Sequence, residues 1–225
     1  NGCSYCIIPY TRGAPRSRPV AEVLLEIERL VDKGFLEVIL IGVNLVEYCA
    51  NGVDLADLLP QIAAIQGLKR LRLSSLSPEL VTPKLQTAIL QTEKVCPNMH
   101  LVLQSGSNAV LQKMRRRYSQ EDFLAIVQNL RQKKPEFTFS TDIIVGFPGE
   151  TEKDFEDTLQ VIKAAHFVRA HVFPFSARSH TRAALFADDV PEEEKKSRKR
   201  VLKQLCYETA FAWRQKFVGR KEEIL

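Results

Sequence analysis

Short apolar runs rich in β-branched residues alternate along the chain with longer amphipathic segments. Such runs are typical of strands, whereas apolar positions three and four residues apart indicate helices with one buried face. The predicted strands cover residues 37–41, 70–73, 100–103, 137–145 and 169–173, after a first strand near residues 6–8. The predicted helices cover residues 19–33, 54–65, 78–91, 108–114, 120–133, 152–164 and 191–217. Two of them open with a hydroxyl followed three residues later by a carboxylate, a capping-box signature, at Ser119/Asp122 and Thr151/Asp154.

This alternation predicts an α/β fold, in which crossover helices join the strands of a parallel sheet. Residues 38–41 and 143–145 are apolar at every position, so we expect both faces of these strands to be covered. A closed or partial barrel and an open, doubly wound sheet both satisfy the pattern.

Composition adds a moderate basic excess and a scattered set of cysteines. The 225 residues carry a net charge of +5, which fits an anionic partner such as RNA. The five cysteines lack the spacing of a disulfide framework, so we expect a reducing, cytoplasmic setting; they stand at positions 3, 6, 49, 96 and 206. We expect no membrane span and no secretory signal, because no long apolar run is present.

Cys3 and Cys6 form a Cys-x-x-Cys pair with several possible chemistries. Structural zinc needs four ligands, and the four histidines stand singly along the chain. A thioredoxin-like pair opens a helix, but Pro9 and Gly13 follow closely here. An iron–sulfur cluster needs more than two cysteines, and a distant partner would come from Cys49, Cys96 or Cys206. Each of these three is also explained as an ordinary buried cysteine, and the first pair as two chance cysteines.

Small polar residues follow five of the predicted strands, where parallel α/β folds bind their ligands. They are Gly42 to Asn44, Ser74 and Ser75, Gln104 to Ser107, Gly146 to Glu150, and Ser176. Strand-to-helix loops use glycine and capping residues in any case, so the indication comes from the five together. The Gly146 loop lacks the Lys-Ser/Thr ending of a P-loop.

Basic residues cluster twice. Arg12, Arg16 and Arg18 follow the cysteine pair, and we expect them to contact RNA phosphates. Residues 115–117 are three consecutive arginines at the end of a predicted helix, where a solvated face explains them equally well.

These residues resemble the radical S-adenosylmethionine (SAM) methylthiotransferases. That family carries Cys-x-x-x-Cys-x-x-Cys followed by Pro and Arg-Gly, and residues 3–13 match its last two cysteines and this tail. The family's first cysteine would lie four residues before Cys3. Residues 103–107, 114–118 and 141–151 match further family motifs in the same order, so the resemblance spans the chain.

Residues 41–45, 72–76 and 171–176 look most similar to the branch that modifies N6-threonylcarbamoyladenosine 37 of tRNA. The alternatives within the family are isopentenyladenosine 37 of tRNA, whose branch usually has Gln in place of Val43, and a ribosomal-protein aspartate. A non-catalytic barrel that binds RNA is the alternative outside the family. After Ser176 the family usually reads Pro-Arg-Pro-Gly-Thr, and residues 177–181 depart from this.

The resemblance implies a partial (β/α)6 TIM-like barrel, the radical SAM core, over residues 1–217. It also implies an N-terminal domain with a second cluster, and a C-terminal RNA-binding β module that would begin at residues 218–225. We expect the isolated chain, with two of three cluster ligands, to be inactive alone.

The resemblance also implies roles for individual residues. Cys3 and Cys6 would ligate a [4Fe-4S] cluster whose open iron binds SAM, and Tyr5 would lie near the adenine. The remaining SAM contacts would come from Gly42, Val43 and Asn44 at the amino group, Gln104 and Ser105 at the ribose or methionyl part, Arg116 at the carboxylate, and Ile144 and Gly146 beside the adenine.

The reaction so implied takes hydrogen from C2 of the tRNA adenine and leaves a methylthio group there, with a second SAM donating the methyl. The implied partners are tRNA, an electron-donor protein and a sulfur source.

Overall fold

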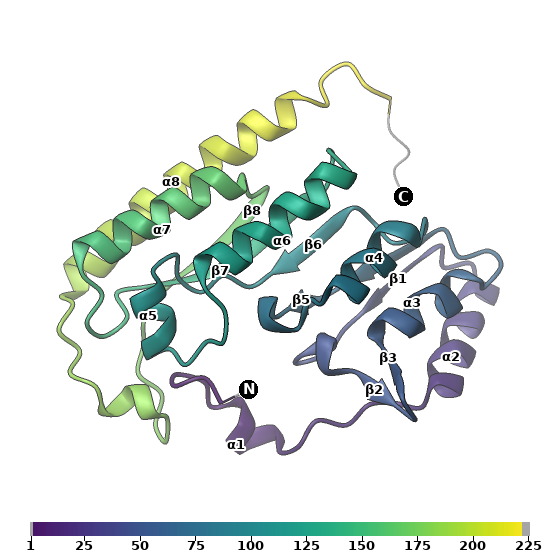
Figure 1. Cartoon of the computed structure of the whole chain (residues 1–225), viewed down its shortest axis with the longest axis horizontal. Helices are drawn as coiled ribbons and strands as arrows, with labels where there is room; N and C mark the ends of the chain where they lie inside the picture. Colours follow the sequence, from purple (N-terminus) through teal and green to yellow (C-terminus); the bar gives the residue numbers. More distant parts are fainter. Residues whose placement is uncertain (1, 222–225) are drawn as a thin grey trace.

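Parallel strands form a layer at the centre of the molecule, divided into a two-stranded sheet and a four-stranded sheet (Figure 1). The computed structural model describes residues 2–221. β1 (Glu37–Leu40) pairs with β4 (Arg70–Leu73), and β5 (Ser75–Leu76) continues β4 beyond a break at Ser74. The sheet then runs from β5 through β6 (Asn98–Leu101) and β7 (Thr138–Val145) to β8 (Arg169–Pro174), always in parallel.

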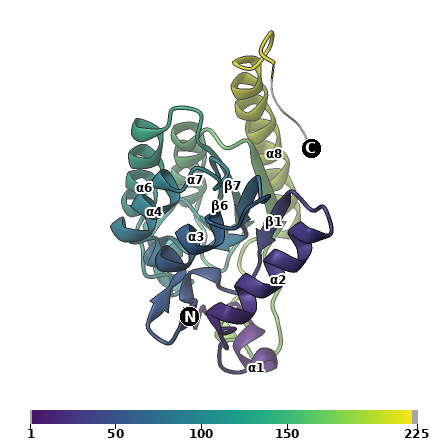
Figure 2. The same ribbon diagram turned by 90° about the vertical axis from the view of Figure 1, so that its right-hand side faces the viewer.

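Helices connect the strands and cover the outer face of this sheet (Figure 2). They are α2 (Val20–Asp32), α3 (Leu55–Ala63), α4 (Pro83–Gln91), α6 (Gln120–Lys133), α7 (Glu152–Ala165) and α8 (Glu192–Gln215), whereas α5 (Asn108–Lys113) packs in a separate small cluster around Phe147. The main core lies between these helices and the sheet, with Phe123, Phe139 and Phe167 fully buried in it. The architecture confirms the predicted partial, TIM-like barrel.

The inner face of the sheet is only partly covered, contrary to the prediction for residues 38–41. Along β7 every second residue is buried against the helices, while Ser140, Asp142 and Ile144 face inward and are half-buried. On the first strand and just beyond it, Ile39 is 54% and Ile41 80% exposed. An inner face open to a ligand explains these exposed apolar side chains, because a fully packed barrel would bury them.

The predicted first strand near residues 6–8 is wrong. The chain forms a turn at Cys3–Cys6 and then the short helix α1 (Ile8–Arg12), with Pro9 in its first turn. Proline is favoured there because its fixed φ suits a helix start and its missing N–H is not needed. Among the described residues the two parallel sheets therefore hold five strand positions, counting β4 and β5 as one.

Several shorter elements were not predicted as they occur. The hairpin of β2 (Cys49–Ala50) and β3 (Val53–Asp54) turns at Asn51-Gly52, both with positive φ. The predicted helix over residues 78–91 divides into a 3-10 turn, η2 (Pro78–Leu80), and α4, which Thr82 caps. Two further 3-10 turns, η1 (Leu45–Glu47) and η3 (Arg182–Leu185), lie in loops. Residues 218–221 form a turn and coil, and the rest of the predicted β module lies outside the described residues.

The loop after β6 is tied to α7 by hydrogen bonds. Both predicted capping boxes are present, and in the second Asp154 also accepts a 2.5 Å bond from the Ser107 hydroxyl. The Gly106 N–H donates to Thr158 Oγ1 at 3.0 Å. This loop contains Gln104, which lines the cavity. The contact between the loop and α7 therefore positions part of the site.

We expect Gly106→Ala to lower the free energy of unfolding by about 2–3 kcal/mol, because an added methyl would overpack this contact. Its Cβ would lie 2.4 Å from Thr158 Cα, a backbone atom of α7. Thermal or denaturant unfolding measures the change. Gly42→Ala is the matched control, since its Cβ would meet no atom closer than 3.4 Å. Equal stability of the two variants would show that α7 shifts to accommodate the methyl group. This result would contradict close packing between Gly106 and α7.

Candidate functional site

A cavity of about 1280 Å³ opens on the inner side of the sheet, at the carboxyl ends of its strands. Its wall combines the N-terminal turn with residues that follow β1, β5 and β6 and with Asp142 of β7. It therefore occupies the place where parallel α/β folds bind ligands.

Hydrogen bonds of Ser4 hold the N-terminal turn against two segments that are distant in sequence. Ser4 is buried; its N–H donates to the Met114 carbonyl at 3.0 Å and its hydroxyl to the Lys113 carbonyl at 2.8 Å. The Ala183 N–H, from η3, donates to the Ser4 carbonyl at 2.8 Å. Because Ser4 faces the protein, Cys3 and Cys6 on either side of it line the cavity as free, partly exposed thiols.

Arg116 lies beside Cys3 and is almost fully buried. Its guanidinium donates to Cys3 Sγ at 3.0 Å, to Ser77 Oγ at 3.1 Å and to the Tyr118 hydroxyl at 3.3 Å. It also reaches Glu79 Oε2 at 3.5 Å. Burial alone would lower the pKa of Arg116, but the neighbouring anionic and phenolic groups outweigh burial and raise this pKa. Arg116 is therefore a permanent cation that suits an anionic sulfur.

Two tyrosines complete the surroundings of Cys3. Tyr5 meets Phe147 edge to face, with ring centroids 6.3 Å apart, and burial raises the pKa of Tyr5. Tyr118 lies under the Arg116 guanidinium and donates to the carbonyls of Val102 and Leu103. Both phenols stay neutral, so they bring apolar surface and hydrogen bonds to the site without adding charge.

The structure brings most of the predicted site residues to this one cavity. Its lining includes Cys3, Tyr5, Cys6, Gly42, Val43, Asn44, Gln104 and Arg116. The Asn44 side-chain nitrogen is buried and has no hydrogen-bond partner among the described residues. Gln104 has a positive φ of 63°, a conformation that costs energy for a non-glycine residue and is often found at binding sites. The Asn44 amide, which has no hydrogen-bond partner, and the strained backbone of Gln104 lie in one wall. Both features are consistent with a polar ligand that binds there.

Three predicted residues do not line the cavity. Ser105 is buried, and its hydroxyl accepts from the Ser107 N–H at 3.2 Å. Ile144 packs with Tyr5 against a small apolar cluster around Phe147. Gly146 donates to Glu150 at 2.6 Å, and a Cβ there would clash with Lys195. These contacts give Ser105, Ile144 and Gly146 supporting positions.

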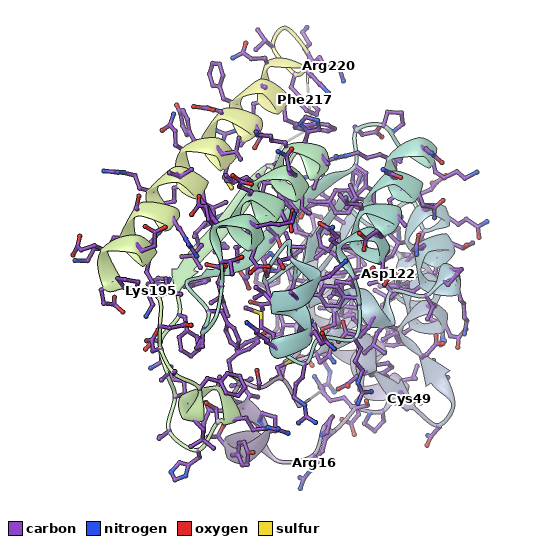
Figure 3. The ribbon with its side chains drawn as sticks, turned by 60° about the vertical axis from the view of Figure 1, so that its left-hand side comes forward. Arg16, Cys49, Asp122, Lys195, Phe217 and Arg220 are labelled. Atoms are coloured by element: carbon purple, nitrogen blue, oxygen red, sulfur yellow. The ribbon has the colours of Figure 1, made fainter. Side chains whose placement is uncertain are left out.

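The predicted RNA-contacting arginines also lie along the cavity. Arg18 is exposed but forms ion pairs with Glu22 and Glu26, so its charge is largely offset. Arg12 and Arg16 are exposed and have no ion pair within the described part of the chain (Figure 3 labels Arg16). The predicted phosphate contacts therefore rest on two of the three arginines.

The other cysteines do not join the pair. Cys49 is exposed on β2, Cys96 is buried outside the cavity, and Cys206 is buried on α8. Burial raises the pKa of Cys206 to about 11, as expected of an inert core thiol. Within residues 2–221 no three metal-ligating side chains come together. The two thiols facing one cavity thus fit an iron–sulfur cluster as two of its ligands.

Several site residues escaped the sequence analysis. Ser4 and Ser77 showed no pattern, but Ser140 and Asp142 are polar at alternate positions of β7, an indication of an inward-facing polar row. Asp142 lies 3.3 Å from the Nε2 atom of His100, whose Nδ1 atom lies 3.0 Å from Ser140 Oγ. Of these residues, Asp142 lines the cavity together with Gln104.

No helix of the described part is long and apolar enough to cross a membrane.

Relatives of known name match the chain along its whole length. It is 44% identical over 223 residues to the threonylcarbamoyladenosine tRNA methylthiotransferase MtaB of Chlamydia pneumoniae, with 99% of this chain and 53% of that protein covered. It is 40% identical to the tRNA-2-methylthio-N(6)-dimethylallyladenosine synthase of Finegoldia magna, with 100% of this chain and 50% of that protein covered. The chain thus spans about half the length of the curated relatives it matches.

The fold has solved neighbours as well. The radical SAM methyltransferase TsrM of Kitasatospora setae, whose structure contains cobalamin and a [4Fe-4S] cluster, aligns with a TM-score of 0.67 at 18% identity. The alignment covers 85% of this chain and 37% of that one. Residues 1–162 match the model of the radical SAM superfamily. With paired thiols at the mouth of a partial barrel and this match over most of its length, the chain belongs to the radical SAM superfamily.

Proposed function

We propose that this chain is the catalytic core of a tRNA methylthiotransferase that adds a methylthio group at C2 of N6-threonylcarbamoyladenosine 37. The observation that carries the proposal is the 40–44% identity to tRNA methylthiotransferases over 99–100% of the chain. The thiol-lined cavity supports it from the structure. The cytoplasm, where tRNA is modified, is the corresponding setting.

Relatives named for two substrates support two versions of the proposal. One matching relative is named for threonylcarbamoyladenosine, and others at 40–43% identity are named for dimethylallyladenosine, the isopentenyladenosine alternative. The strand-end motifs at residues 41–45 and 171–176 favour the first substrate by their resemblance to that branch.

Cys3 and Cys6 are proposed to hold iron of a [4Fe-4S] cluster. Their shared cavity and the Arg116 donor at 3.0 Å from Cys3 Sγ suit an anionic, metal-bound sulfur. When bound, the cluster and SAM supply the one-electron chemistry that removes a hydrogen atom from an unactivated carbon. The protein's contribution is to bind, orient and exclude water.

The rest of the wall is proposed to bind SAM and the base. Asn44 brings an unsatisfied amide, and Gln104 brings a side chain on strained backbone. The contacts of Arg116 leave N–H capacity for a carboxylate, since a guanidinium has five donors. Arg12 and Arg16 at the rim are proposed to contact tRNA phosphates. An electron-donor protein, a sulfur source and a second cluster complete the proposed system.

The substrate is tested with full-length protein whose iron–sulfur clusters have been reconstituted, incubated with SAM, a reductant and tRNA. We expect a methylthio product from tRNA that carries threonylcarbamoyladenosine 37, and little from tRNA that carries isopentenyladenosine 37. Mass spectrometry of digested nucleosides measures both. Modification of isopentenyladenosine alone would reassign the substrate, and SAM cleavage without a tRNA product would contradict the proposed reaction.

We expect Cys6→Ser to abolish methylthio transfer and to lower the iron content of the reconstituted protein, because it removes a cluster thiolate. Cys49→Ser is the matched control: Cys49 is free and exposed but does not line the cavity, so activity and iron content should stay near those of the parent. Iron analysis and product formation measure the two effects. A Cys6→Ser variant with full activity would remove this cysteine from the site.

We expect Arg116→Ala to destabilise the fold by about 2–4 kcal/mol, because it removes several hydrogen bonds to a buried charged group. The neighbouring Arg117 is exposed and has no hydrogen bond or ion pair among the described residues, so Arg117→Ala should change stability little. Denaturant unfolding compares the two variants. Equal stabilities would mean that the Arg116 contacts contribute nothing to holding the Cys3 turn.

A further inference from the structure

A second hollow, of about 1010 Å³, lies between α7 and α8 on the outside of the barrel. Figure 3 shows α8 running along one flank of the molecule from Lys195 to the turn at Phe217. We call this hollow the basic groove, because its charged lining consists of five cations and one carboxylate: Lys163, Lys196, Lys199, Arg200, Lys203 and Glu208. Lys163 comes from α7 and the others from α8.

The lining of the groove is positively charged on balance. Its charged residues sum to +4, whereas the whole chain carries +5. Only Lys196 has an ion-pair partner, Glu193; the other four cations form no ion pair within the described residues. Near the cavity, Arg18 and Arg116 are paired with carboxylates, whereas Arg12 and Arg16 form no ion pair within the described residues. The basic groove shares no lining residue with the proposed active site.

This concentration of charge has an internal cost. Lys199 and Lys203 are four residues apart on one helix face, as are Lys196 and Arg200, and like charges at this spacing destabilise a helix by about 0.2–0.5 kcal/mol per pair. Glu193 offsets the charge of Lys196, but Lys199 and Lys203 have no ion-pair partner within the described residues, and Glu208 accepts from Gln204. A bound polyanion would relieve the repulsion.

The floor and end of the groove suit a nucleic acid. Leu159, Val201 and Leu205 give an apolar floor. Tyr207, 61% exposed, closes one end and stacks on Phe211 with ring centroids 6.4 Å apart. Cations beside an exposed aromatic ring are the combination that binds a phosphate backbone and stacks an unpaired base.

We propose that the basic groove is a second tRNA-binding surface, which grips the phosphate backbone away from the modified base. The inference rests on the proposed function, since it takes tRNA as the substrate. α8 begins after the loop that leaves the carboxyl end of β8, so Lys196 lies at the cavity end of the barrel. Lys203 stands roughly 10 Å further along the helix. A tRNA arm with its target base in the cavity would continue along this flank.

An acidic electron-donor protein is a less suitable occupant. Such a donor must approach the cluster thiols, Cys3 and Cys6, which line the inner cavity. The basic groove shares no lining residue with that cavity and lies on the outer side of the helices. Electron transfer would therefore have to cross the helix layer and the sheet.

The test measures binding of unmodified-tRNA transcript to the full-length protein over a range of salt concentrations, without SAM or turnover. In the groove variant, Lys199, Arg200 and Lys203 are each replaced by Ser. We expect its affinity to fall roughly tenfold or more at physiological salt, and the slope of log K against log salt to fall by about 2–3. Lys199→Arg with Lys203→Arg, which keeps the charges, should bind as the parent does.

The matched control replaces Lys33, Lys69 and Lys133 by Ser. This variant also loses three positive charges. The three lysines are exposed and lie near the amino ends of the strands or at the end of α6, outside the groove. The control should keep parental affinity and slope. Circular dichroism and the melting temperature verify that all variants are folded.

Each remaining outcome overturns the inference in a different way. Parental affinity in the groove variant would overturn it alone and leave the proposed function intact. An equal loss in groove and control variants would assign the effect to net charge. A parent that binds no tRNA would overturn the inference together with the tRNA substrate. Loss of binding to a reduced acidic electron donor, with tRNA binding unchanged, would assign the groove to that protein.

Discussion

The buried guanidinium of Arg116 joins parts of the chain that are far apart in sequence. It contacts Cys3, 113 residues away, and Ser77, 39 residues away, and it lies over the ring of Tyr118. A buried cation is tolerated only when hydrogen-bond acceptors and anionic groups surround it, so these segments must assemble together. The position of the thiols is therefore a consequence of the same contacts that satisfy this charge.

The partial barrel creates the second constraint. Helices bury one face of the sheet in a continuous core, while the inner face keeps exposed Ile39 and Ile41 beside polar Asp142. Apolar surface left in water costs about 25 cal/mol per Å², and an unsatisfied Asn44 amide adds to that cost. A ligand with both apolar and polar parts offsets these costs. The wall is thus organised around an occupant more than around its own packing.

Local patterns predicted most of the fold because they are properties of neighbouring residues. Strand β1 and helix α6 occur within one residue of their predicted bounds, and both capping boxes formed, since each depends on a spacing of a few positions. The error near residues 6–8 arose because three apolar residues before a proline suit a short helix as well as a strand. Asn51-Gly52 is a typical two-residue hairpin turn, but the flanking strands are only two residues long, so no hairpin was predicted there. The Arg116 contacts and the burial of Ser4 depend on distant partners, which no local pattern contains.

In the proposed complex with tRNA, the two basic regions would contact phosphates at different places on the barrel. Phosphate contacts supply affinity and register without reading the base, and they act from any surface that the backbone can reach. Arg12 and Arg16 stand at the rim of the cavity, whereas the basic groove lies along the outer flank. Substitutions in the groove would then weaken the binding of all tRNAs equally. The choice between threonylcarbamoyl and dimethylallyl groups would instead depend on contacts with the cavity wall. A carboxylate-bearing group calls for a cation and hydrogen-bond donors, and a hydrocarbon group calls for apolar wall. Phosphates are the same in both tRNAs, so the basic excess of the sequence does not distinguish the two proposed substrates.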